Sequence, residues 1–479
     1  MVLDNIEPRR VMHWFEALCA IPHGSGNTKK ISDFCVEFAR ERSFEHYQDS
    51  LNNVIIIAPP SPGYEASPTV IIQGHLDMVC EKTADCGIDF KTDGLSLETD
   101  GKYVWASGTT LGGDDGIAIA MALAIMEDTA LPHPRLEAVF TVDEETGMYG
   151  AAGIDCSRLQ GRTMLNLDSE DEGIFTVGCA GGVRANCALP VETEPFSGRA
   201  VHIAVSGLTG GHSGQEIDKC RASANMLMGR VLAALMPDGG FRLVSITGGN
   251  MDNAICVQAD AVAAVGDVEA ARRAVAELEK ALKREYETPD PGLCVTLEET
   301  AAAELCMTRR STQSCVSALL MFPSGVQEMC PDIPGLVETS LNLGILRAGP
   351  DGFTASFSVR SSVGSRKELL KLKLETVMRA LGGSVSFAGQ YPAWEFRRDS
   401  HLRDTMTEVF REQYGREPQV LTIHAGLECG LLGEKLPGLD CVSIGPDLHD
   451  IHTPRERMDI ASVQRVWRFV LEVLKRLKV

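Results

Sequence analysis

The segment Thr69-Val70-Ile71-Ile72-Gln73-Gly74-His75-Leu76-Asp77 joins a β-branched apolar run to a histidine and an aspartate. Such a run is typical of a strand that is buried in a parallel or mixed sheet. Residues i and i+2 of an extended chain face the same side, so His75 and Asp77 are expected to project together from the end of this strand. Two interpretations are open at this point: a buried structural histidine, or a metal-binding histidine whose ring is oriented by the aspartate.

Further apolar strands and helices surround this segment on both sides. Strands are predicted at residues 53–57, 136–142, 163–167, 419–423 and 440–444. Helices are predicted at residues 7–18, 27–39, 402–414 and 460–477, and the Ala-rich apolar run at 116–126 is predicted to be a buried helix. Strands that alternate with helices indicate a layered α/β domain.

The pattern changes between about residue 190 and residue 393. One strand, a helix, two strands, a second helix and a closing strand follow one another in residues 199–297, and a similar order recurs in residues 314–387. We therefore predict an α+β insertion at residues 191–393, built from two βαββαβ-like units. The α/β domain is then discontinuous and consists of residues 1–190 and 394–479.

Composition limits the classes of function. A chain of 479 residues is too long for a single hydrophobic core, and its 45 basic and 66 acidic residues give a net charge of −21. This charge argues against binding to nucleic acid or to anionic membranes, and it is compatible with binding metal cations. The fifteen cysteines contain no C-x-x-C pair, the N-terminus has no signal-peptide pattern, and no segment is apolar enough to span a bilayer. We therefore expect a cytoplasmic protein.

Acidic residues follow several of the predicted strands. Asp114 and Asp115 stand between glycines before the Ala-rich helix, residues 143–145 are all acidic, and Asp168 follows the strand at 163–167. A helix cap or a solvated surface can explain each group alone. Together they would lie at the sheet edge where α/β folds bind ligands, and His452 is a further candidate ligand. The charges of three carboxylates and one hydroxide balance those of two divalent cations, and paired metal ions are a known hydrolytic device.

These motifs, taken in order, resemble those of the dinuclear zinc peptidases of the M20 family, and most closely its bacterial aminoacyl-histidine dipeptidases. The resemblance covers almost the whole chain. The segments that carry it are 75–77, 113–116, 143–147, 178–182, 208–214, 424–430, Asp168 and His452. It implies a zinc-peptidase-like α/β/α catalytic domain that is interrupted by a large α+β lid domain.

The resemblance also implies a role for each metal-site residue. His75 and Asp168 would bind one zinc ion, Glu145 and His452 would bind the other, and Asp114 would bridge the two. The remaining roles fall to Asp77, which would orient His75, and to Glu144, the general base that would activate a metal-bridged hydroxide.

Four further residues are candidates for contact with the substrate. By the same resemblance, His212 of the lid would polarise the scissile carbonyl. Arg360 is a candidate for gripping the terminal carboxylate, which a guanidinium can hold in bidentate fashion. Glu428 would either contact the substrate amino group or form a structural ion pair. Asn253 lies in the segment 250–256, where Asp252 and Cys256 depart from the family pattern.

The sequence therefore predicts a zinc-dependent dipeptidase that hydrolyses small unblocked dipeptides of the Xaa-His type, such as β-Ala-His, with a broad range of substrates. Two Zn²⁺ ions per chain are expected, and Co²⁺ or Mn²⁺ could fill the same N/O sites. The alternatives are an M20-type amidohydrolase or deacylase of N-acyl amino acids, and a metal-binding protein without activity. A homodimer is compatible with the resemblance, which leaves the oligomeric state open.

Overall fold

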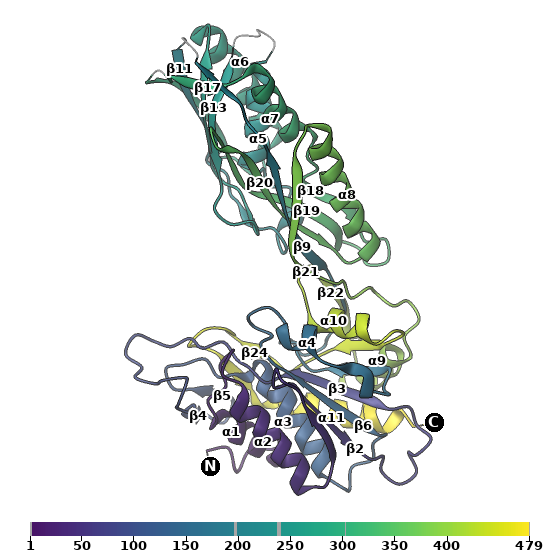
Figure 1. Cartoon of the computed structure of the whole chain (residues 1–479). Helices are drawn as coiled ribbons and strands as arrows, with labels where there is room; N and C mark the ends of the chain where they lie inside the picture. Colours follow the sequence, from purple (N-terminus) through teal and green to yellow (C-terminus); the bar gives the residue numbers. More distant parts are fainter. Residues whose placement is uncertain (1, 196–198, 237–240, 302, 479) are drawn as a thin grey trace. The chain divides into compact units, whose positions relative to one another are not determined.

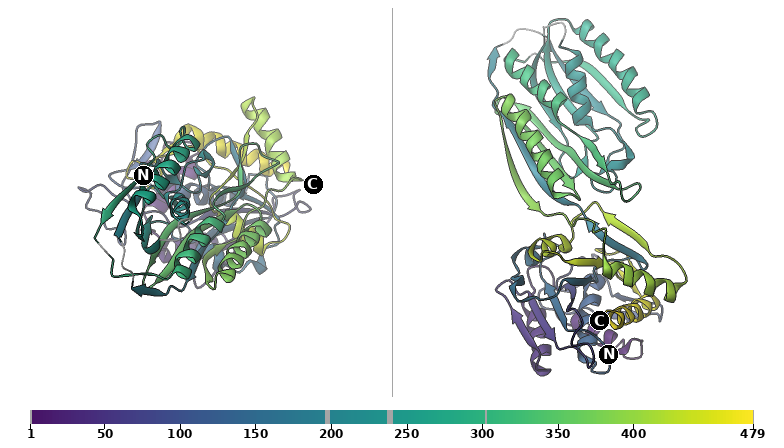
Figure 2. Two further views of the ribbon diagram at one scale, coloured as in Figure 1. Left: turned by 90° about the horizontal axis from the view of Figure 1, so that it is seen from above. Right: turned by 90° about the vertical axis from the view of Figure 1, so that its right-hand side faces the viewer.

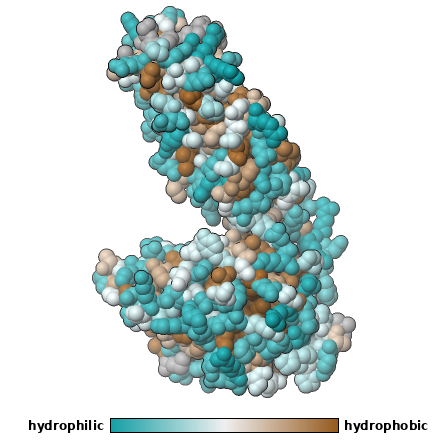
Figure 3. All heavy atoms as spheres, in the orientation of Figure 1, coloured by the Kyte–Doolittle hydropathy of each residue, from teal (hydrophilic) through white to brown (hydrophobic). Residues whose placement is uncertain are grey.

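The computed structural model describes residues 2–195, 199–236, 241–301 and 303–478 (Figure 1). The chain divides into two compact units. The first consists of Met1–Gly178, Phe396–Thr422 and Leu427–Val479, and the second consists of Cys179–Glu395 and Ile423–Gly426. Each unit has its own large hydrophobic core, whereas the face of the molecule seen in Figure 3 is mainly hydrophilic with scattered apolar residues. Within the described residues, no helix is both long and apolar enough to cross a membrane.

An eight-stranded mixed sheet forms the centre of the first unit, in the order β1-β2-β6-β3-β7-β23-β8-β22. Its strands are β1 (Glu45–Gln48), β2 (Val54–Ala58), β3 (Val70–His75), β6 (Leu136–Thr141), β7 (Thr163–Asn166), β8 (Ile174–Cys179), β22 (Gln419–Ile423) and β23 (Asp440–Ser443). Strand β3 pairs in parallel with β6 and with β7. Because parallel strands end at the same edge of a sheet, the loops that follow these three strands begin side by side.

Helices and a small second sheet complete the first unit. The helices are α1 (Arg9–Cys19), α2 (Lys29–Glu41), α3 (Gly113–Glu127), α4 (Tyr149–Gly153), α9 (His401–Tyr414), α10 (Glu428–Lys435) and α11 (Ile460–Arg476). The segment from Ile117 to Met126 is buried on every side, and α3 packs against α1 and β3. The small sheet has the order β24-β25-β5-β4, from β24 (Leu448–His449), β25 (Arg457–Asp459), β5 (Tyr103–Ala106) and β4 (Leu97–Thr99).

The second unit contains an antiparallel sheet in two similar βαββαβ halves, as predicted except for the first strand of the second half. The first half runs β11 (Arg199–Ser206), α5 (Ala224–Ala234), β13 (Arg242–Gly248), β15 (Ala259–Val265), α6 (Val268–Glu285) and β16 (Cys294–Thr300). The second half runs β9 (Gly181–Leu189), α7 (Arg309–Met321), β19 (Val337–Gly349), β20 (Gly352–Ser361), α8 (Gly364–Ala380) and β21 (Ser384–Tyr391). Pairing of β13 with β19 joins the halves, and the four helices line one face of the sheet (Figure 2).

Strand β9 differs from the expectation. Residues 181–189 were placed in the first domain, but they form an inner strand between β20 and β21 in the second unit. The first half of this unit is thus inserted between β9 and α7. Buried and more exposed side chains alternate from Val183 to Leu189, so the pattern of a strand is present, but no strand was predicted here.

Short ladders complete the second unit. They pair β10 (Thr193–Pro195) with β17 (Leu305–Met307), β12 (Gly211–His212) with β14 (Ala254–Ile255), and β18 (Gly325–Met329) with β19.

Candidate metal centre

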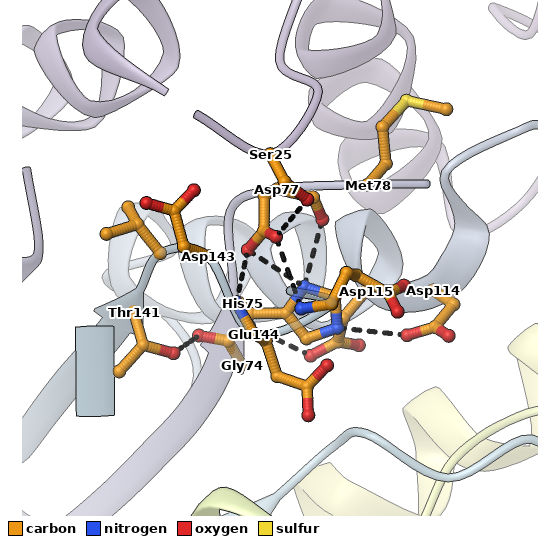
Figure 4. A network of polar contacts seen from close by, with 12 residues as sticks. Ser25, Gly74, His75, Asp77, Met78, Asp114, Asp115, Thr141, Asp143 and Glu144 are labelled. Atoms are coloured by element: carbon orange, nitrogen blue, oxygen red, sulfur yellow. Dashed lines mark hydrogen bonds and ion pairs between the residues drawn. The ribbon is translucent and has the colours of Figure 1, made fainter. Parts of the chain in front are cut away.

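Two histidines and three carboxylates of the first unit lie close together, and Figure 4 shows one of the histidines, His75, with its partners Asp77 and Asp114. His75, Glu145 and Asp168 stand at or just after the ends of β3, β6 and β7. Asp114 belongs to the first turn of α3, and His452 follows β24. His75 Nε2 lies 3.0 Å from Asp114 Oδ1 and 3.5 Å from Asp168 Oδ1. His452 Nε2 lies 3.1 Å from Asp114 Oδ2 and 2.9 Å from Glu145 Oε1. The two oxygens of Asp114 therefore face different histidines, and each histidine has a second carboxylate beside it.

The possible ligand atoms form two overlapping groups. One contains His75, Asp114 and Glu145, the other contains His75, Asp115 and Asp168, and within each group the atoms lie within 4.8 Å of one another. Imidazole nitrogens and carboxylate oxygens are donors that suit zinc and its neighbours in the transition series. Asp115 was not among the predicted ligands. Its Oδ2 accepts the backbone N–H of His75 at 3.2 Å.

The pKa values of these side chains are shifted in the direction expected for a cluster with too much negative charge. Burial raises the pKa of Asp168, and the charges of Asp114 and Glu145 raise it further, against the effect of His75. The carboxylates of Asp114 and Glu145 together raise the pKa of His452 to about 10. Buried carboxylates this close can be ionised together only when cations compensate them. Two divalent cations would supply that charge, so the residues present fit a dinuclear centre.

The hydrogen bonds of His75 define which nitrogen faces the cluster. Its Nδ1 lies 2.9 Å from the backbone oxygen of Asp77 and 3.5 Å from the carboxylate Oδ1 of the same residue. Nδ1–H therefore donates mainly to a carbonyl group, and Nε2 faces Asp114. Burial alone would lower the pKa of His75, but Asp114, Asp168 and Asp77 together raise it well above its usual value.

The carboxylate of Asp77 lies beside the His75 ring and also contacts the loop after β6. It accepts hydrogen bonds from Ser25 Oγ at 2.7 Å and from the backbone N–H groups of Glu144 at 3.1 Å and Glu145 at 3.4 Å. Asp77 thus fixes the loop after β6, and its backbone oxygen, rather than its side chain, makes the shorter contact to the imidazole of His75.

The second unit brings three predicted substrate residues into one neighbourhood. His212 in β12 pairs with Ala254 in β14, and the carbonyl of Asn253 accepts the N–H of Ser213 at 2.8 Å. Nδ1 of His212 accepts the backbone N–H groups of Gly214 and Gln215, so its proton belongs on Nε2. Burial lowers the pKa of His212, and the charge of Arg360 lowers it further. A neutral imidazole with an Nε2–H donor results.

Arg360 lies beside His424, which belongs to the segment 424–430. Its Nη1 donates to the backbone oxygen of His424 at 3.3 Å, and Ser340 Oγ lies 2.8 Å from His424 Nε2. Burial lowers the pKa of His424 to about 4, with smaller contributions from Arg360 and His212. Among the described residues, the buried Arg360 Nε and His424 Nδ1 have no hydrogen-bond partner. This neighbourhood can accept an anionic group.

Residues 71–476 match the sequence profile of peptidase family M20/M25/M40, which is most of the chain. The chain belongs to this peptidase family. Its sequence is 34% identical over 479 residues to the cytosol non-specific dipeptidase of Escherichia coli (strain K12), with 99% of each chain covered. The crystal structure of aminoacylhistidine dipeptidase from Vibrio alginolyticus has a TM-score of 0.95 and 33% identity, covering 99% of this chain and 98% of that one. A tripeptidase from Staphylococcus aureus (TM-score 0.58, 17% identity, 99% of each chain) shares the fold.

Glu428 of this peptidase is fully buried in α10. Its Oε2 accepts hydrogen bonds from Gln73 of β3 at 2.6 Å and from Thr141 of β6 at 2.5 Å, and Gln73 accepts one from Asn166 of β7 at 2.5 Å. These partners are neutral, in contrast to the ion pair that was one of the two expectations. Burial raises the pKa of Glu428 to about 7, and the negative charges of Asp168 and Asp77 add to the effect. The network ties together the three strands that lead to the candidate ligands.

Proposed function

We propose that this M20 peptidase is a metal-dependent dipeptidase that hydrolyses unblocked dipeptides, including those of the aminoacyl-histidine type. The observation that carries the proposal is the position of Asp114, whose two carboxylate oxygens face His75 and His452, each beside a second acid. The two relatives that match almost the full length of the chain are named as dipeptidases, and this supports the choice of substrate.

The proposed centre holds two divalent cations, with Zn²⁺ as the first candidate. His75 and Asp168 would bind one ion, Glu145 and His452 the other, and Asp114 both. When bound, such ions supply Lewis acidity that lowers the pKa of water and stabilises negative charge on oxygen. The distances between the two imidazoles and the three carboxylates support this set.

Glu144 is the proposed general base. Without bound cations, burial raises its pKa to about 9 against the effect of His75, and the charges of Asp168, Glu428 and Glu145 add to the rise. Two divalent cations beside it would favour its ionised form, which is the form that can accept a proton. Its carboxylate has no hydrogen bond or ion pair among the described residues, and its backbone is fixed by Asp77. It would accept a proton from the attacking water and deliver it to the leaving amine as the peptide C–N bond breaks.

The second unit supplies the proposed substrate-binding groups. Nε2–H of the neutral His212 would donate to the scissile carbonyl oxygen, where negative charge develops during attack. The guanidinium of Arg360 would bind the terminal carboxylate of the dipeptide, and Asn253 would hydrogen-bond to the substrate. A cytoplasmic location is proposed as well, because all fifteen cysteines are free thiols.

A panel of dipeptides tests the function. The full-length protein is stripped with a chelator and assayed on β-Ala-His, Gly-His and other free dipeptides, with N-acetylated dipeptides and N-acyl amino acids as controls. Release of amino acids from free dipeptides alone, and only after zinc is restored, supports the proposal. Turnover of acylated substrates alone would point to a deacylase. Failure to act on any of these compounds after zinc is restored would contradict the proposed hydrolytic activity.

A further inference from the structure

Glu456 is a buried carboxylate that the proposed chemistry does not use. Its side chain belongs to the first unit, and the residue is only 3% exposed. Oε2 accepts the backbone N–H of Leu111 at 2.8 Å and of Gly112 at 3.3 Å, and Oε1 accepts that of Gly113 at 2.8 Å. One carboxylate therefore satisfies three consecutive backbone donors.

These contacts join two segments that each lead to a candidate ligand. Gly113 directly precedes Asp114, whose dihedral angles (φ −83°, ψ 103°) are not helical although it lies in the first turn of α3. Glu456 follows His452 by four residues in the loop between β24 and β25. The two ligands face each other at 3.1 Å, so the position of each loop determines whether this distance is kept.

The sequence of the 111–113 loop is adapted to this contact. Gly112 has a φ of +68°, a left-handed conformation that glycine adopts without strain. A Cβ atom on Gly113 would lie 3.2 Å from Oε1 of Glu456 and 3.2 Å from Leu448 Cδ2, which is closer than ordinary contact. The two glycines thus permit the backbone to approach the carboxylate of Glu456. A larger residue at either position would displace the loop from that carboxylate.

His452 requires such support because its own backbone is unfavourable. Its φ is +59°, in the left-handed region that non-glycine residues adopt at a cost, and Asp450 nearby has a φ of +53°. The side chain of His452 is 45% exposed, so packing alone does not hold it in place. The three hydrogen bonds of Glu456 restrain the end of this loop relative to the loop before Asp114.

We propose that Glu456 is a positioning residue of the metal centre, which holds Asp114 and His452 at the separation needed to bind a metal ion together. The proposal rests on the proposed dinuclear function. Glu456 touches neither substrate nor ligand atoms in this arrangement and acts through the backbone of residues 111–113. Residues that orient metal ligands typically change metal affinity by about 10- to 100-fold when they are replaced.

Glu137 offers a matched control in the same unit. It is also fully buried, and its carboxylate accepts the backbone N–H groups of Gln160 at 3.1 Å and Gly161 at 3.0 Å. It lies near the start of β6, whereas Glu144 and Glu145 follow the end of that strand. Loss of a buried carboxylate that binds a loop is therefore common to E137Q and E456Q, but only E456Q alters a loop that leads to a candidate ligand.

The experiment measures metal binding rather than turnover. Full-length wild type, E456Q and E137Q are stripped of metal, and Zn²⁺ affinity and stoichiometry are measured by competition with a chelator, beside the thermal unfolding of each metal-free protein. Absorption spectra of the Co²⁺-loaded proteins report ligand geometry. We expect E456Q to bind at least one ion about 10- to 100-fold more weakly and to change the Co²⁺ spectrum. E137Q should lower the unfolding temperature and keep wild-type affinity.

Three results would overturn the proposal in distinguishable ways. Wild type that binds no pair of ions would remove the proposed function and this inference with it. Wild-type affinity and spectrum in E456Q would refute the positioning role alone. Equal loss of affinity in E137Q and E456Q would show a general effect of stability. If E456Q does not fold, E456D replaces it, since it keeps the charge and shortens the reach, and the same loss of affinity is expected.

Discussion

Glu144 differs from the other acids of the centre because its carboxylate has no hydrogen bond or ion pair among the described residues. A group of this kind can move a proton without losing a structural contact. Replacement of Glu144 by Gln removes the base and changes the volume little, so we expect kcat to fall by about 10²- to 10⁴-fold, the usual contribution of general acid–base catalysis. Zinc content and KM should stay near wild type, measured by elemental analysis and steady-state kinetics. Retained turnover would assign the base to another residue.

At the scale of single residues, the sequence predicted some contacts of the candidate site and not others. The acids and histidine that follow predicted strands could be identified from the sequence. The alternation of side chains along a strand and the order of the strands are enough to place them at one edge of the sheet. The pairing of Glu456 with residues 111–113 is not visible, since it joins segments more than three hundred positions apart through backbone donors. The same reason applies to the hydrogen bond between Glu428 and Gln73.

Among the elements, α9 and α11 both contact the buried carboxylate of Glu172, in the turn between β7 and β8, and these contacts set a dependence of stability on pH. Arg465 of α11 donates to Glu172 Oε1 at 2.7 Å, and the hydroxyl of Tyr414 donates to the same atom at 2.7 Å. Burial alone would raise the pKa of Glu172, but Arg465 and the hydroxyls of Tyr414 and Ser462 lower it. A carboxylate whose pKa is lowered by folding stabilises the native state above its unfolded pKa, and this contribution is lost as the pH falls.

Replacement of Glu172 by Gln should therefore reduce the stability of the first unit at pH 7 by about 1–2 kcal/mol, toward the lower end of the range for hydrogen bonds to charged groups because Arg465 is partly exposed to solvent. The difference from wild type should shrink as the pH falls below about 4.3, the usual pKa of glutamate. Thermal unfolding at a series of pH values measures it. E417Q, which removes the exposed Glu417 partner of Arg411, is the control and should change stability little. If the stability difference between wild type and E172Q stays constant with pH, the proposed coupling between the ionisation of Glu172 and stability is wrong.

At the level of elements, the sequence predicted most of what local pattern determines. Helix α11 has clear apolar periodicity, α3 is a long Ala-rich apolar run, and β3, β6 and β7 are short β-branched or apolar runs, so both kinds of element were predicted. Strand β9 was missed because its place in a sheet depends on pairing with β20 and β21, which follow it by more than 150 residues. The alternating side chains of residues 183–189 indicate a strand, but nothing local indicates which strands it pairs with.

For the whole molecule, the presence of two separate hydrophobic cores predicts how metal removal affects stability. All of the candidate ligands lie in the first unit, whereas His212 and Arg360 lie in the second. A ligand that binds only the native state stabilises it by about 2.7 kcal/mol at a concentration 100 times its dissociation constant, and it stabilises only the unit that it binds. Calorimetry of chelated and zinc-loaded protein should show two transitions, of which zinc raises one by several degrees and leaves the other nearly unchanged. E144Q, which keeps the ligands, should show the same shift. A shift of both transitions by the same amount would mean that the two cores unfold together, and no shift at all would remove the proposed metal centre.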